Sequence, residues 1–144
     1  MSVKRIALVG VSRNRAVFSR RLMCDLIARG YDVVPVNPSV NEIEGQICYK
    51  RPLDITPEVT NAILMTRAES LPMLAKDCAV AGFKSVWILK SSGSHASRLQ
   101  AVTILNENLI DVIDGLCPYL FLDDAGVPHS LHRGIARLFG TLPK

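Results

Sequence analysis

The sequence IALVGVSRNR, residues 6–15, carries the strongest structural signal in the chain. A run of aliphatic side chains ends at Gly10, and a serine and two arginines follow at once. An amphipathic segment, residues 17–29, comes next. This order is typical of a buried strand that turns into a helix, and it puts amides and cationic side chains where phosphates bind best. We therefore expect a phosphate-bearing ligand at this junction.

Strand-like and helix-like segments alternate along the chain. Consecutive aliphatics predict buried strands, and apolar residues at helical spacing predict helices. Strands are predicted over residues 4–11, 32–36, 62–66, 85–89 and 110–113, a short one over 46–49, and helices over 17–29, 71–80 and 95–106. Pro35 lacks a ladder donor, which predicts a bulge or an edge position for its strand. The alternation predicts an α/β fold, a doubly wound parallel sheet of Rossmann-like type, in which ligands sit at the carboxyl ends of the strands.

The composition indicates one globular domain, residues 1–144, with a C-terminal extension over residues 119–144 that holds a short helix. Of the 144 residues, 49% are hydrophobic, which is enough for a core without disulfides or a structural metal. The N-terminal residues lack a secretory pattern, and no window approaches the ~20 apolar residues of a membrane span. We expect a cytoplasmic protein with no membrane partner and with four reduced, widely spaced cysteines.

Positive charge is concentrated near the N-terminus. Residues 1–36 hold seven Lys and Arg and two Asp, a charge of +5. The whole chain carries +4, so the remaining residues carry −1. This clustering favours a small polyanion over nucleic acid. Basic residues are not interleaved with aromatic ones, as single-stranded nucleic acid requires. We expect a small-molecule ligand and no nucleic acid partner.

Four polar loops follow the predicted strands and converge in a crevice: residues 11–15, 37–39, 66–67 and 90–93. The glycine-rich dinucleotide fingerprint is incomplete, because only Gly10 is present, and Asn37 stands where NAD-binding domains place a carboxylate. NAD is therefore disfavoured, and NADP is not excluded by Asn37. The Ser12 hydroxyl, with the amides of Ser12, Arg13 and Asn14, can form an anion nest, with Arg13 and Arg15 adding charge. The alternative is that Ser12 only caps the helix.

Several segments together carry a family resemblance: residues 9–12, Ser19, 30–38 (GYDVVPVNP), 43–46, 65–67 and 81–87. Over about residues 4–116 the chain resembles the stand-alone coenzyme A-binding proteins. These share their fold with the nucleotide-binding domain of the succinyl-CoA synthetase alpha subunit. The resemblance implies coenzyme A or an acyl-CoA as ligand. The 3′-phosphate of coenzyme A gives the arginine excess a reason.

The resemblance also implies a set of binding residues. Residues 11–13 would line the pyrophosphate, Asn37 and Pro38 would shape the pocket floor, and residues 65–67 would border the adenosine and pantetheine. The candidate cofactor-binding residues are Gly10, Val11, Ser12, Arg13, Asn14, Arg15, Ser19, Asn37, Pro38, Met65, Thr66 and Arg67. The chain departs from the family at residues 13–16, where relatives often have a lysine and a proline.

No catalytic constellation is visible in the sequence, and no metal site is predicted. Cys117, His129 and His132 lack a carboxylate partner and metal-ligand spacing, and His95 sits at a predicted helix start. In the synthetase the phosphorylated histidine lies in a second domain, so we expect no acyl-CoA ligation by this chain alone. The expected role is non-catalytic: carriage, sensing or regulation. Alternatives are an NAD(P)-binding redox-sensing module or a small CoA-dependent enzyme that uses Cys117. The apolar helix over residues 131–138 suggests a homodimer.

Overall fold

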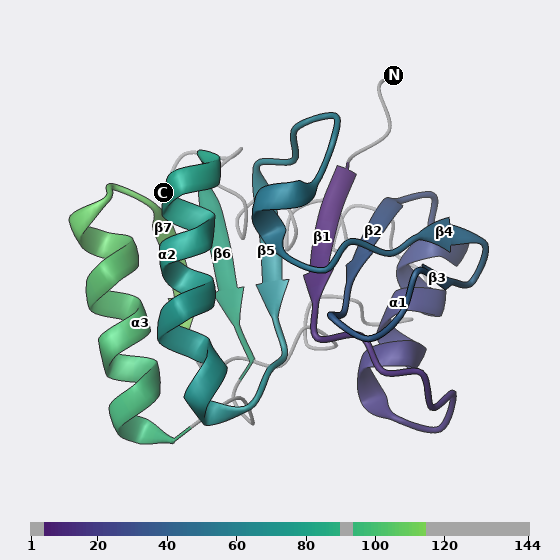
Figure 1. Ribbon diagram of the computed structural model, residues 1–144, viewed down its shortest axis with the longest axis horizontal. Helices are drawn as coiled ribbons and strands as arrows, with labels where there is room; N and C mark the ends of the chain where they lie inside the picture. Colours follow the sequence, from purple (N-terminus) through teal and green to yellow (C-terminus); the bar gives the residue numbers. More distant parts are fainter. Residues whose placement is uncertain (1–4, 90–93, 115–144) are drawn as a thin grey trace.

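The computed structural model describes residues 5–89 and 94–114 (Figure 1). The elements run in the order β1 (Arg5–Val9), α1 (Phe18–Ala28), β2 (Asp32–Val36), β3 (Glu42–Ile43), β4 (Gln46–Ile47), η1 (Pro52–Asp54), β5 (Asn61–Leu64), η2 (Ala68–Ser70), α2 (Leu71–Ala81), β6 (Ser85–Ile88), α3 (His95–Glu107) and β7 (Asp111–Asp114). None of the described helices is long and apolar enough to cross a bilayer. The predicted tail, with Cys117, His129 and His132, and the loop at residues 90–93 lie outside the described residues.

The central sheet is parallel, in the order β2-β1-β5-β6-β7. From β1 the chain moves to one side, to β2, and from β5 it moves to the other, to β6 and β7. The strand order therefore reverses between β1 and β5, which is the switch point where such sheets bind ligands. This arrangement confirms the predicted doubly wound α/β fold.

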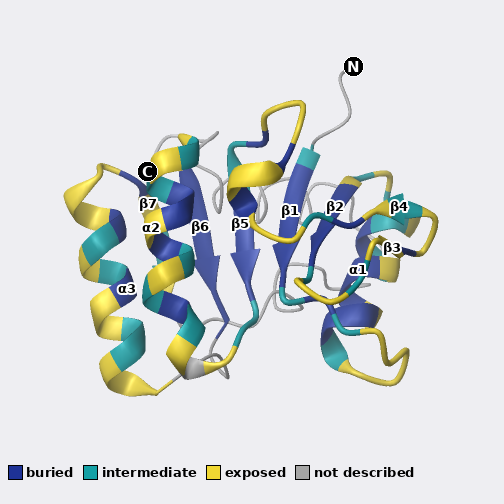
Figure 2. Cartoon of the chain, viewed as in Figure 1, coloured by how far each residue is buried: buried dark blue, intermediate teal, exposed yellow. Residues whose placement is uncertain are grey.

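Strand side chains alternate between two apolar clusters, one on each face of the sheet. Ile6 and Leu8 pack with residues of α1, whereas Ala7 and Val9 pack with residues of α2 and α3. In Figure 2 most of β1, β2, β5 and β6 and the inner sides of these helices are coloured as buried. Because both faces are covered, consecutive strand residues are all apolar, which is the pattern that predicted parallel strands.

The structure corrects several predicted strand ends. β1 stops at Val9 and β5 at Leu64, not at residues 11 and 66, because the chain turns out of the sheet at its carboxyl edge. The short strand predicted over residues 46–49 is only Gln46–Ile47, paired antiparallel with β3, and Tyr49 forms a separate parallel bridge to Val36. Strand β2 lies at the sheet edge, as Pro35 predicted.

Candidate functional site

Gly10 joins β1 to the loop that was predicted to bind phosphate. Its φ is +99°, and a Cβ built there would lie 2.3 Å from the carbonyl oxygen of Met65. The amide of Gly10 donates to the carbonyl of Val36 over 2.9 Å, and the Met65 amide donates to Val9 over 2.8 Å. The ends of β1, β2 and β5 therefore meet at this glycine, and a side chain would force them apart.

Side chains of the loop of residues 11–16 and of helix α1 accept hydrogen bonds from the amides of this loop. The Ser12 amide donates to Ser19 Oγ over 2.9 Å, the Asn14 amide to Ser12 Oγ over 3.0 Å, and the Ala16 amide to Asn14 Oδ1 over 2.9 Å. The three-amide nest expected from the sequence is therefore not open, because two of its amides already donate inside the protein. Helix α1 begins after Val17 without a side-chain cap, so the alternative role of Ser12 as a helix cap is wrong.

Asn37 fastens this loop to the end of β2. Its Nδ2 donates to the carbonyl of Val11 over 2.8 Å, and its Oδ1 accepts from the Ser39 amide over 2.8 Å. The main-chain amide of Asn37 donates to Tyr49 over 2.9 Å. The asparagine that the resemblance places at the pocket floor thus has both ends of its side chain engaged and shapes the site by holding backbone.

A crevice of about 330 Å³ opens at the switch point, within the range of ligand pockets. We call it the switch-point crevice. Its lining comes from the ends of β1, β2 and β5, from the segment after β4, and from α2: Val9, Gly10, Val36, Pro38, Lys50, Arg51, Thr66, Ser70, Met73, Leu74 and Asp77. The structure therefore brings together Gly10, Pro38 and Thr66 of the predicted residues, whereas Met65 packs into the core on the α1 side and Arg67 is exposed.

Two cationic residues of this crevice, Lys50 and Arg51, were missed from the sequence. They follow a stretch without clear periodicity, and the bridge between Tyr49 and Val36 brings them to the sheet edge. Arg51 pairs with the buried Asp77 carboxylate through two hydrogen bonds, of 3.0 and 2.7 Å. These bonds raise the pKa of Arg51 and tie the segment after β4 to α2.

Thr66 lines the same crevice and has an unsatisfied hydroxyl. Its Oγ1 is buried and has no hydrogen-bond partner among the described residues. A buried hydroxyl without a partner costs about 1–3 kcal/mol. Because Thr66 lines the crevice, a χ1 rotamer that turns the hydroxyl into the cavity would let a ligand supply the missing partner.

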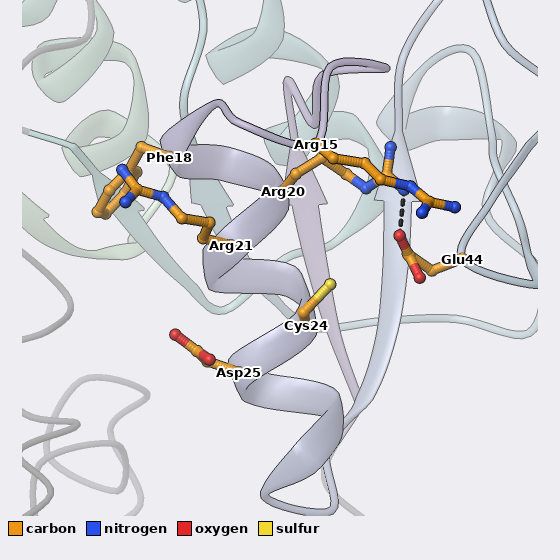
Figure 3. A pocket seen from close by; sticks show the side chains of 7 residues that line it. All are labelled: Arg15, Phe18, Arg20, Arg21, Cys24, Asp25 and Glu44. Atoms are coloured by element: carbon orange, nitrogen blue, oxygen red, sulfur yellow. Dashed lines mark hydrogen bonds and ion pairs between the residues drawn. The ribbon is translucent and has the colours of Figure 1, made fainter.

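A second, more open groove of about 680 Å³ lies along α1 (Figure 3). Arg15 and Arg20 reach toward Glu44 on one side, and Phe18 and Arg21 lie on the other. The hydrogen bond from Arg20 and the charge of Arg15 lower the pKa of Glu44. The other lining residues are Cys24 and Asp25. The lining holds three arginines and two carboxylates, a net charge of +1, whereas residues 1–36 as a whole carry +5.

Metal ligands do not gather in the part of the chain that the structure describes: no three His, Cys, Asp or Glu residues there are placed to share an ion. The two buried thiols are also poorly suited to chemistry. Burial raises the pKa of Cys48, and it raises that of Cys78 to about 12. Both thiols therefore stay protonated at neutral pH.

Residues 4–123 match the model of a family described as the CoA binding domain. The chain belongs to this family. The assignment confirms the resemblance stated from the sequence and favours coenzyme A over the NAD(P) alternative. The match covers all of the residues that the structure describes.

Two curated relatives of this chain are much longer proteins. An ADP-forming acetate–CoA ligase of Methanocaldococcus jannaschii is 24% identical over 104 residues, which are 72% of this chain and 15% of the ligase. The alpha subunit of an ADP-forming acetate–CoA ligase of Pyrococcus furiosus is 33% identical over 94 residues, 61% of this chain and 20% of the subunit. The chain thus spans a fifth or less of the length of these relatives.

Solved structures of similar size share the fold. A conserved hypothetical protein from Pyrococcus furiosus matches with a TM-score of 0.72 and 30% identity, over 81% of this chain and 97% of that protein. A hypothetical protein from Pyrococcus horikoshii matches with a TM-score of 0.71 and 26% identity, over 94% and 84% of the two chains. This architecture therefore occurs in other chains of about this length.

Proposed function

We propose that this chain binds coenzyme A in the switch-point crevice, as a carrier, sensor or regulator rather than as a catalyst. The crevice carries the proposal, because it combines the position where doubly wound sheets bind ligands with the unsatisfied hydroxyl of Thr66. Membership of the CoA binding domain family indicates coenzyme A as the class of ligand. The proposed ligand is free coenzyme A or an acyl-CoA. We also propose that the protein acts in the cytoplasm and consists of a single domain.

The charges around the crevice suit a ligand with more than one phosphate group. The loop of residues 11–16 continues from Gly10, which lines the crevice, and in our proposal Ser12 and Arg13 face the pyrophosphate. Lys50 lies at the crevice itself and offers a second cationic position, whereas the charge of Arg51 is balanced by Asp77. Coenzyme A carries a pyrophosphate and a separate 3′-phosphate, and guanidinium and ammonium groups bind both. The apolar part of the lining, with Met73 and Leu74, suits the pantetheine arm.

Calorimetric titration of the wild type and of Thr66→Val tests this function. Valine keeps the shape of threonine but lacks the hydroxyl, so we expect coenzyme A to bind about tenfold more weakly, a loss of about 1.4 kcal/mol. The same substitution removes an unsatisfied buried group, so the free energy of unfolding of the ligand-free protein stays equal or rises. Binding of NAD by the wild type without binding of coenzyme A would refute the proposal.

A further inference from the structure

Arg20 is a buried charge beneath the loop of residues 11–16. The residue is 7% exposed, and its Nη1 donates to the carbonyls of Ser12 and Arg13 over 3.3 and 3.0 Å. Its Nη2 donates to the carboxylate of Glu44. Arg21, the next residue of α1, is exposed. Of these two adjacent arginines, only Arg20 is therefore engaged with the loop.

These hydrogen bonds fix the direction of two peptide planes. In a trans peptide the carbonyl and the following amide point in opposite directions. Because Arg20 draws the carbonyl of Ser12 toward itself, the amide of Arg13 points away from the protein interior, and it donates to no group among the described residues. The hydroxyl of Ser12 accepts from the Asn14 amide, so its proton is free to be donated elsewhere.

Glu44 holds Arg20 in this position. It lies in the turn between β3 and β4, with φ +52°, and Figure 3 shows its carboxylate directed at the Arg20 guanidinium. The Arg20 side chain is only 8% exposed, whereas that of Glu44 is 28% exposed, so the pair lies at the edge of the buried region with its carboxylate in partial contact with water. This pair therefore links helix α1, and with it the loop before α1, to the β3–β4 ribbon.

We infer that Arg20 is a positioning residue that directs the Arg13 amide and the Ser12 hydroxyl at a diphosphate. The inference deepens the proposed function and rests on it for the identity of the ligand. In this proposal Arg20 does not touch the ligand. Its hydrogen bonds to the carbonyls of Ser12 and Arg13 fix the loop, and its positive charge lies directly beneath the loop. Asn37 acts in the same way on the Val11 carbonyl, so three consecutive carbonyls are held by side chains.

Arg20→Met and Arg21→Met are the matched pair that tests this inference by calorimetry. Both remove one positive charge from the same helix, so the general loss of charge is equal. We expect Arg20→Met to raise the Kd for coenzyme A about tenfold or more and Arg21→Met to raise it less than threefold. Arg20→Lys keeps the charge with fewer fixed donors, and it should restore part of the affinity. Equal Kd values for the two methionine variants would overturn the inference.

Hydrogen exchange in the ligand-free protein gives a second readout. The amides of Ser12 and Asn14 should exchange at least tenfold faster in Arg20→Met, while Arg21→Met leaves them unchanged. Unchanged exchange in both variants would overturn the positioning role even if coenzyme A binds the wild type. Absence of coenzyme A binding by the wild type, with faster exchange in Arg20→Met, would instead refute the proposed function. Should Arg20→Met fail to fold, Arg20→Lys carries both measurements.

Discussion

Gly10→Ala is expected to lower the free energy of unfolding by about 4 kcal/mol. The backbone of Gly10 has φ +99°, where a side chain costs about 1–2 kcal/mol. The added Cβ would also lie 2.3 Å from the carbonyl oxygen and 2.8 Å from the carbonyl carbon of Met65. Both contacts are with backbone at the end of a central strand, so relief requires β1 and β5 to separate. Urea unfolding measures the change.

Gly30→Ala is the matched control for this prediction. Gly30 has a similar φ, +90°, but a Cβ there would meet nothing within 4 Å. The control therefore reports conformational strain alone, about 1 kcal/mol. The difference between the two variants is the contribution of the close approach of β1 to β5. Equal destabilisation by both substitutions would show that this approach is not required.

Stability should fall steeply above pH 9 because of Cys78. Burial, and secondarily the neighbouring Asp77 carboxylate, raises the pKa of the Cys78 thiol from 9.0 to about 12. The unfolded chain then loses this proton at lower pH than the folded chain, so the folded state is disfavoured as the pH rises from 9 to 12. The slope is about 1.4 kcal/mol per pH unit, and the loss reaches about 4 kcal/mol at pH 12.

Cys78→Ala isolates the contribution of this thiol to the alkaline slope. Urea unfolding at pH 7.5, 9 and 10.5 should show about 2 kcal/mol less alkaline loss for the variant than for the wild type by pH 10.5. Cys24→Ala, which removes an exposed thiol from α1, is the control and should keep the wild-type slope. A wild-type slope in Cys78→Ala would mean that the buried thiol is not responsible. Burial also raises the pKa of Cys48, so a smaller slope of the same sign should persist.

Most of the fold could be predicted from the sequence because its signals are local and mutually consistent. The consecutive aliphatic residues of β1 indicate a strand that is buried on both faces, and Pro35 in β2 indicates an edge strand. Helix α2 begins and ends where Pro72 and Gly82 indicate. The β3–β4 ribbon could not be predicted in full, because strands of two residues are too short to show a period.

The site could be predicted only in part, because its details depend on contacts between distant segments. Gly10 and Thr66 follow buried strands, so their place at the carboxyl edge follows from the fold. Lys50 reaches the crevice through the pairing of Tyr49 with β2, which leaves no local pattern. The burial of Arg20 could not be predicted from the sequence either, because it depends on Glu44, 24 residues away in the sequence. For the same reason the engagement of the loop amides could not be foreseen.

The most direct test of the central claim is a titration of the ¹⁵N-labelled chain with coenzyme A, followed by two-dimensional NMR. Binding in the switch-point crevice predicts saturable shifts of the amides of Gly10, Arg13 and Thr66. The amides of Cys24 and Asp25, which line the groove along α1, should change little. Shifts confined to Cys24 and Asp25, or no saturable shifts at all, would contradict coenzyme A binding at the switch point.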